Sequence, residues 1–259
     1  MTQTVRCVVE YDGTNFCGLQ FQPTLRSVAG ELEKALSGLL LEEIKITAAG
    51  RTDAGVHATG QVISFKTRAS FPFVRLPIAM NTILPGDLSI REAAVVDDDF
   101  SARFSARERT YVYLISHQPL RNALLNDFTH HVYGTLDLDA MRLGAAGLIG
   151  EHDFRSLCGV LPDKGKTIRA LREISIDRAA DIVRVLVRGD GFLHRMVRIT
   201  LGTLIEMAQG RRDPDSSRAI LAACDRRMAG YTAPAQGLYL AGVRYDEFDS
   251  FCEPPLTRK

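Results

Sequence analysis

The sequence predicts an α+β protein of two similar subdomains, each a mainly antiparallel sheet with helices on one face. Two observations predict this. The chain has 259 residues and 46% hydrophobic content, enough for two ordinary domains, and the order strand–helix–strand–loop–strand occurs twice along it. We expect an N-terminal subdomain over residues 1–105 and a C-terminal subdomain over residues 106–259. Because clefts between such halves are favoured ligand sites, the active-site cleft is expected between them.

The N-terminal half contains the first copy of this order. Residues 3–11 alternate in polarity, as a half-buried strand does, and Ser27 is a predicted N-cap for an amphipathic helix that runs to residue 40. Residues 44–47 and 62–65 are predicted strands on either side of a glycine-rich loop. Residues 76–83 follow as a helix and residues 88–95 as a strand.

The C-terminal half repeats the order without obvious sequence identity. Residues 110–115 form a β-prone strand, and Asp139 is the predicted cap of a helix that ends at Gly150. Residues 174–176 and 182–187 are predicted to form two strands. Helices are expected over residues 192–207 and 214–223, and a last strand over residues 238–243.

Composition excludes several classes of protein. The net charge of +1 gives no general attraction to nucleic acid. Five scattered cysteines show neither a Cys-x-x-Cys pair nor metal-ligand spacing, so we expect free thiols and no zinc. There is no apolar run of about 20 residues and no basic leader before an apolar stretch. We therefore expect a cytoplasmic protein without a membrane segment.

Residues 50–62 are the most informative segment of the chain. They place the carboxylate of Asp53 between small residues, two positions after Arg51 and among three glycines. Such a loop, leading into a strand, can aim a nucleophile or a general acid/base. An attacking carboxylate must be ionised, and Arg51 or a more remote arginine could lower its pKa. The alternative is a tight turn in which Asp53 bonds its own backbone.

Three other segments carry weaker signals. Residues 103–113 interleave three arginines with three aromatic residues, which suits flipped or single-stranded nucleotides but also ordinary sheet packing. Residues 189–198 form a glycine-rich turn that leads into a predicted helix with His194, Arg195 and Arg198, a possible anion site or an ordinary basic surface helix. Residues 235–240 indicate only a turn into a core strand.

These segments, in this order, resemble the motifs of the bacterial tRNA pseudouridine synthase A family. The resemblance is most specific at residues 50–62 and extends over residues 10–14, 18–20, 81–87 and 100–106. It covers the chain from about Tyr11 to Val243.

The resemblance implies a function and a set of site residues. It implies isomerisation of uridine to pseudouridine at positions 38, 39 and 40 of the tRNA anticodon stem-loop, with base flipping, no metal and no cofactor. Asp53 matches the catalytic aspartate and nucleophile, and Arg198 matches the arginine paired with it. Tyr111 matches the tyrosine that contacts the uracil, Arg51 a residue linked to displacing the target base, and Leu238 the pocket wall. The family typically forms homodimers.

Two residues depart from the family pattern, and two alternative functions are left open by the sequence. Leu19 stands where many relatives have tryptophan, and Phe21 where a basic residue is common, so tRNA affinity or site choice is expected to differ. A noncatalytic RNA-binding or tRNA-folding module would not need Asp53. A carboxylate-dependent hydrolase would want a second carboxylate, for which Asp12 is the nearby candidate. Attack of Asp53 on C1′, attack on C6 and a glycal route are not distinguished by sequence.

Overall fold

The computed structural model describes residues 2–162 and 166–257. The chain divides into two compact units, the first formed by Met1–Arg109 with Tyr239–Lys259 and the second by Thr110–Leu238. Both combine strands with helices, so the α+β class is confirmed. The division differs from the expected one at the C-terminal end, because residues 239–259 belong to the first unit. Within the described residues, no helix has the length and apolar character that a membrane crossing requires.

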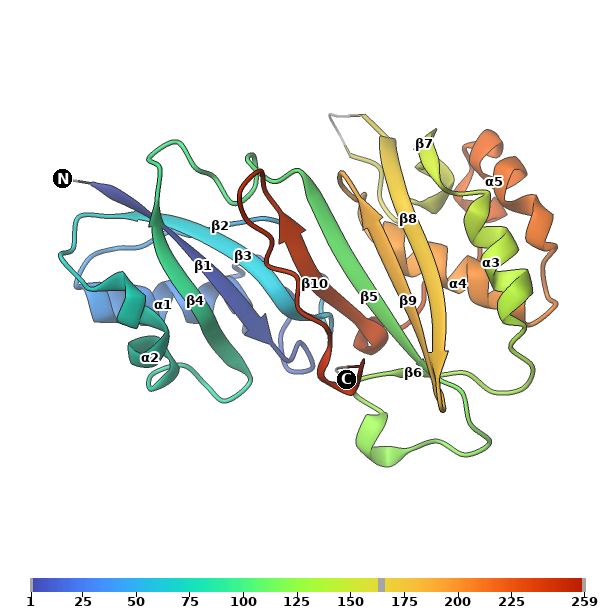
Figure 1. The fold of residues 1–259 in the computed structure, drawn as a ribbon, viewed down its shortest axis with the longest axis horizontal. Helices are drawn as coiled ribbons and strands as arrows, with labels where there is room; N and C mark the ends of the chain where they lie inside the picture. Colours follow the sequence, from blue (N-terminus) through green and yellow to red (C-terminus); the bar gives the residue numbers. More distant parts are fainter. Residues whose placement is uncertain (1, 163–165, 258–259) are drawn as a thin grey trace. The chain divides into compact units, whose positions relative to one another are not determined.

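The first unit is built on a mixed sheet (Figure 1). β1 pairs antiparallel with both β3 and β4, whereas β10 runs parallel to β3 through the pair Tyr239 and His57. This long-range pairing brings the C-terminal strand into the first unit. The strands lie in the order β4-β1-β3-β10, with β2 on β3; their bounds are β1 Gln3–Tyr11, β2 Thr47–Ala48, β3 His57–Thr67, β4 Leu88–Val96 and β10 Leu238–Arg244.

Two helices cover this sheet. α1 (Val28–Leu40) begins where predicted, because the Ser27 hydroxyl accepts a hydrogen bond from the Gly30 backbone N–H at 3.2 Å. α2 (Leu76–Asn81) follows the short 3-10 helix η1 (Phe73–Arg75), packs against β4 and touches α1 (Figure 1). The unit also contains the 3-10 helix η7 (Pro255–Thr257).

The predicted strand over residues 44–47 is largely wrong. Only Thr47–Ala48 pair with β3. The backbone N–H of Ile44 donates to the Ser37 hydroxyl at 2.9 Å, and that of Ile46 donates to the Glu33 carboxylate at 3.1 Å. Side chains of α1 therefore satisfy the backbone donors that a longer strand would direct to a neighbouring strand.

The second unit also combines strands with helices. Its strands lie in the order β5-β9-β8-β7, with β6 parallel to β5, and α3 packs on β8 and α4 while α5 touches β7 (Figure 1). The strands are β5 Glu108–Ser116, β6 His130–His131, β7 Gly150–Asp153, β8 Ile168–Ala179 and β9 Ile182–Gly189. The helices are α3 Leu138–Ala146, α4 Met196–Ala208 and α5 Ser217–Ala223, with 3-10 turns η2 Ala123–Leu125, η3 Arg155–Leu157, η4 Pro214–Ser216, η5 Arg226–Met228 and η6 Ala235–Gly237.

Two helix starts differ from the predictions. The cap of α3 is Asp137 rather than Asp139, because the Asp137 carboxylate accepts the backbone N–H groups of Asp139 and Ala140. α4 begins at Met196 rather than Phe192, since Arg195 adopts a left-handed conformation with φ 57°. His194 and Arg195 therefore precede the helix, and of the three predicted basic residues Arg198 lies in its first turn.

Candidate active site

Asp53 lies on the loop between β2 and β3, with its side chain half-exposed. Its neighbours Thr52 and Val56 are buried, and the Val56 backbone N–H donates to the Asp53 carbonyl at 3.2 Å to close a turn. Arg51, on the same loop, is exposed. The loop is thus anchored on both sides of Asp53, which leaves the carboxylate at the surface of the first unit.

Hydrogen bonds join this loop to the chain segment from Tyr11 to Leu19. The hydroxyl groups of Tyr11 and Thr52 are hydrogen-bonded at 2.8 Å, and burial raises the pKa of Tyr11 to about 12, so that hydroxyl stays protonated at neutral pH. The Leu19 N–H donates to the Thr52 carbonyl at 3.1 Å, and the Gly55 N–H to the Phe16 carbonyl at 3.3 Å. Two hydrogen bonds to the loop backbone and one to the Thr52 side chain therefore hold the loop around Asp53.

Two glycines allow this close approach. A Cβ atom on Gly13 would lie 2.1 Å from the carbonyl oxygen of Val56, and one on Gly18 would lie 2.8 Å from that of Thr52. Gly18 also has φ +98°, a conformation that other residues rarely adopt. The opening turn of the chain is therefore shaped to support the Asp53 loop.

His57 links the same turn to the last strand. Its ring is buried, stacks on Tyr239 at a centroid distance of 4.8 Å, and accepts the Gly13 N–H at Nδ1 with a length of 3.0 Å. Asp12 lies 3.2 Å from that nitrogen, and its Oδ1 accepts the backbone N–H of Thr14 at 2.9 Å and its hydroxyl at 2.6 Å. Asp12 is thus committed to turn structure, which removes support from the two-carboxylate hydrolase alternative.

Tyr111 and Arg198 belong to the second unit. Tyr111 is a buried residue of β5 whose ring meets Phe192 edge to face, with centroids 5.1 Å apart. The Arg198 guanidinium donates from Nε to the Ala233 carbonyl at 2.8 Å, and the Ala233 N–H donates back to the Arg198 carbonyl at 3.0 Å. The arginine is therefore held from both its backbone and its side chain.

Tyr113 completes this part of the second unit, and the sequence predicted no role for it. Its hydroxyl donates to the Pro234 carbonyl at 2.9 Å. Burial raises the pKa of Tyr113 well above its usual value, Tyr231 adds to this, and the positive charge of Arg198 opposes it. A Cβ on Gly237 would lie 2.7 Å from the Tyr113 ring, so the turn before the buried Leu238 is packed directly on it.

The five predicted site residues thus fall into two groups. Asp53 and Arg51 share one loop of the first unit, and Tyr111, Arg198 and Leu238 lie in the second unit. The supporting contacts of Thr52, Phe192 and Tyr113 could not be predicted from the sequence. The spacing of the two early glycines was the available signal for the support behind Asp53.

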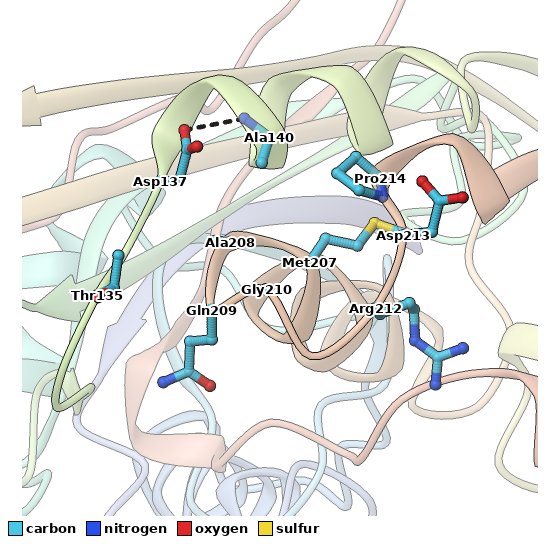
Figure 2. Close-up of a pocket in the computed structure, with 10 residues that line it drawn as sticks. All are labelled: Thr135, Asp137, Ala140, Met207, Ala208, Gln209, Gly210, Arg212, Asp213 and Pro214. Atoms are coloured by element: carbon cyan, nitrogen blue, oxygen red, sulfur yellow. Dashed lines mark hydrogen bonds between the residues drawn. The ribbon is translucent and has the colours of Figure 1, made fainter.

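A separate pocket of about 470 Å³ lies in the second unit, between the start of α3 and the end of α4 (Figure 2). None of the five predicted site residues lines it. Its charged groups serve the fold: Asp137 caps α3, and Arg212 donates to the Glu206 carboxylate and to the Met228 carbonyl. Among the residues that the structure describes, no group of three or more His, Cys, Asp or Glu side chains could hold a metal ion.

Comparison with known proteins identifies the family. A family model described as tRNA pseudouridine synthase matches residues 7–105 and 145–246. A protein of Brevibacillus brevis named tRNA pseudouridine synthase A is 44% identical over 93% of this chain and 99% of its own length. Proteins with the same name from Bacillus pumilus and Bacillus subtilis are 43% and 41% identical, each over 93% of this chain and 99% of their own length. This chain belongs to the tRNA pseudouridine synthase family.

Proposed function

We propose that this protein isomerises uridine to pseudouridine in tRNA, at positions 38, 39 and 40 of the anticodon stem-loop. The observation that carries the proposal is Asp53, a half-exposed carboxylate on a loop whose backbone is fixed by hydrogen bonds, within the part of the chain that the family model matches. Identity of 41–44% over nearly the whole length of three relatives named tRNA pseudouridine synthase A supports it.

The residue roles follow from the matched family motifs. Asp53 is the nucleophile, and Arg198 is the arginine that pairs with it. Tyr111 contacts the uracil and assists proton transfer, Arg51 displaces the target base, and Leu238 forms a wall of the pocket. A hydrogen bond to the Ala233 carbonyl holds the Arg198 side chain within its own unit. The ring contact with Phe192 does the same for Tyr111.

The reaction exchanges two bonds within one nucleotide. The N1–C1′ bond breaks, the uracil turns, and C5 forms a bond to C1′; the C5 proton leaves and N1 gains a proton. Asp53 attacks C1′, attacks C6, or promotes a glycal intermediate, and each route needs an ionised carboxylate beside the sugar or the base. The target base must first leave its stack, which costs a few kcal/mol that stacking and arginine contacts in the pocket offset.

Two further features belong to the proposal. We infer a homodimer, as the family typically forms, and a cytoplasmic location, where the tRNA substrate is available. With tRNA as the substrate, the nearly neutral net charge implies that phosphate contacts are concentrated on part of the surface.

The test is a map of pseudouridine in an unmodified tRNA transcript incubated with the protein. Carbodiimide labelling followed by primer extension is expected to give new stops for positions 38 to 40, and the Asp53→Asn variant is expected to give none. Because asparagine keeps the shape of the side chain, the variant should still bind the transcript. Pseudouridine at other positions would overturn the anticodon assignment, and none at all with intact tRNA binding would favour the noncatalytic RNA-binding module.

A further inference from the structure

The segment at residues 101–113 contains arginines and aromatic residues, and its aromatic rings differ in burial. Tyr113 is fully buried and Tyr111 nearly so. Phe104, in contrast, leaves 80% of its surface exposed, and Arg103 beside it is exposed as well. The tyrosines therefore pack inside the fold, and Arg103 and Phe104, which we call the surface pair, lie on the surface of the first unit.

The backbone under the surface pair is firmly held. The Ser105 N–H donates to the Ser101 carbonyl at 3.0 Å, and the Ser101 N–H donates to the Ser105 hydroxyl at 3.0 Å. Between them, Ala102 is fully buried; its N–H donates to the Ser64 hydroxyl at 3.0 Å and its carbonyl accepts the Tyr245 hydroxyl at 2.7 Å. The exposed Phe104 ring therefore projects into solvent from a turn whose backbone is held by hydrogen bonds.

Arg109 ties this turn to the strand end that precedes the Asp53 loop. Its Nη2 donates to the carbonyl oxygens of Arg103 and Ala49, both at 2.9 Å, and its Nε donates to Ala49 at 3.3 Å. Ala49 directly precedes the residues 50–55 that carry Asp53. One guanidinium therefore fixes the surface pair relative to the beginning of the loop with the candidate nucleophile.

The three arginines of the segment differ in what their side chains contact. Arg107 forms a two-pronged ion pair with Asp246, with nitrogen–oxygen distances of 3.0 and 2.9 Å, and Arg109 is occupied by carbonyl groups. The Arg103 guanidinium carbon lies 5.3 Å from the centre of the Phe104 ring. A planar cation beside an exposed ring on a polar turn matches a nucleotide, whose base stacks while its phosphate binds arginine.

We propose that Arg103 and Phe104 form a nucleotide-binding subsite for an unpaired residue of the RNA substrate, whose base stacks on Phe104 and whose phosphate binds Arg103. The subsite deepens the proposed function and rests on it, because Arg109 joins the Arg103 backbone to Ala49, the residue that precedes the loop with the candidate nucleophile. It increases affinity for tRNA and takes no part in the chemical step. Stacking on a phenylalanine ring accepts every base, so the subsite contributes binding without sequence choice.

The test measures tRNA binding and turnover for Phe104→Ala, Phe104→Trp and Arg103→Gln, with Val74→Ala as the control for loss of a similarly exposed apolar side chain. Fluorescence anisotropy with unmodified tRNA is expected to show Kd raised about 5- to 30-fold for Phe104→Ala, restored by tryptophan and unchanged for the control. The value of kcat should stay within about twofold. Arg103→Gln should reduce the slope of log K against log salt by about one.

Two outcomes would overturn the proposed subsite, and a third would overturn the proposed function alone. A wild-type Kd for Phe104→Ala would remove the subsite. A weakened Kd that tryptophan does not restore, accompanied by a change of oligomeric state in sedimentation, would make Phe104 a contact between copies of this chain instead. If the wild-type protein binds tRNA but forms no pseudouridine, the proposed function fails, while the comparison of Kd values still decides on the subsite.

Discussion

Replacing Gly18 with alanine tests whether the opening turn positions Asp53. The new Cβ would lie 2.8 Å from the Thr52 carbonyl oxygen, and the backbone would have to keep φ +98°. Left-handed backbone costs an alanine about 1–2 kcal/mol, and the close contact adds to it, so we expect a loss of about 2–3 kcal/mol in the free energy of unfolding. This corresponds to a fall in melting temperature of roughly 4–12 °C for a chain of this size.

The effect on activity is expected to exceed the effect on stability. The Thr52 carbonyl that the new Cβ displaces belongs to the residue before Asp53 and accepts the Leu19 N–H at 3.1 Å. A shift of about 1 Å in a catalytic group costs on the order of 100-fold in rate, so kcat should fall by about that factor below the melting transition. Single-turnover assays with saturating protein would measure this rate without a contribution from binding.

Gly38→Ala provides the matched control. Gly38 lies on the exposed face of α1, and a Cβ there would meet no atom within 4 Å. Alanine in a helix is more stable than glycine by roughly 0.5–1 kcal/mol, so this variant should melt slightly higher and keep the wild-type rate. If Gly18→Ala also kept the wild-type rate, the opening turn would not position Asp53.

Three further predictions concern the second unit and the chemistry. Tyr111→Phe should lower kcat by about 100-fold or more, since it removes a group for proton transfer, yet it should melt like the wild type because the ring contact with Phe192 is kept; a wild-type rate would reduce Tyr111 to a packing residue. Burial, with a smaller effect from His131, lowers the pKa of His130 to about 4. The unfolded chain therefore binds more protons between pH 6.5 and 4, so this histidine destabilises the fold by up to about 3 kcal/mol as pH falls through that window. Urea unfolding of His130→Asn should show a weaker dependence on pH there, and an unchanged dependence would contradict the assignment. Dialysis against EDTA, followed by an assay with tRNA folded in sodium chloride, should leave the rate unchanged; activity restored only by an added metal would contradict metal-free catalysis.

The strands that sequence predicted best are those rich in residues that favour strands. Residues 3–11 and 110–115 correspond to β1 and β5 for this reason, although burial in the two strands is nearly continuous and does not alternate as a half-buried strand would. The two-residue strands β2 and β6 are too short to show a period, and the start of α4 is set by the left-handed Arg195, which no propensity predicts. The place of the last strand in the first unit depends on the pairing of Tyr239 with His57, a contact between distant residues.

In the candidate site, too, the features that the sequence could predict are those with a local pattern. The Asp53 loop is a contiguous motif, so the sequence could reveal both the carboxylate and its glycines. The hydrogen bond that joins Tyr11 to Thr52 spans 41 positions in the sequence, and no local pattern predicts that particular pair. The segment at residues 103–113 was ambiguous because stacking rings and core rings have the same composition. Burial then separates Tyr113 from Phe104.

Release of tritium from tRNA labelled at uridine C5 tests most directly whether this protein forms pseudouridine by means of Asp53. Formation of the C5–C1′ bond expels the C5 hydrogen, so every turnover releases one label to water. We predict release by the wild-type protein and none by Asp53→Ala, with comparable tRNA binding by both. Release by Asp53→Ala at the wild-type rate would contradict the catalytic role of Asp53, and no release by a wild-type protein that binds the tRNA would contradict the isomerase activity.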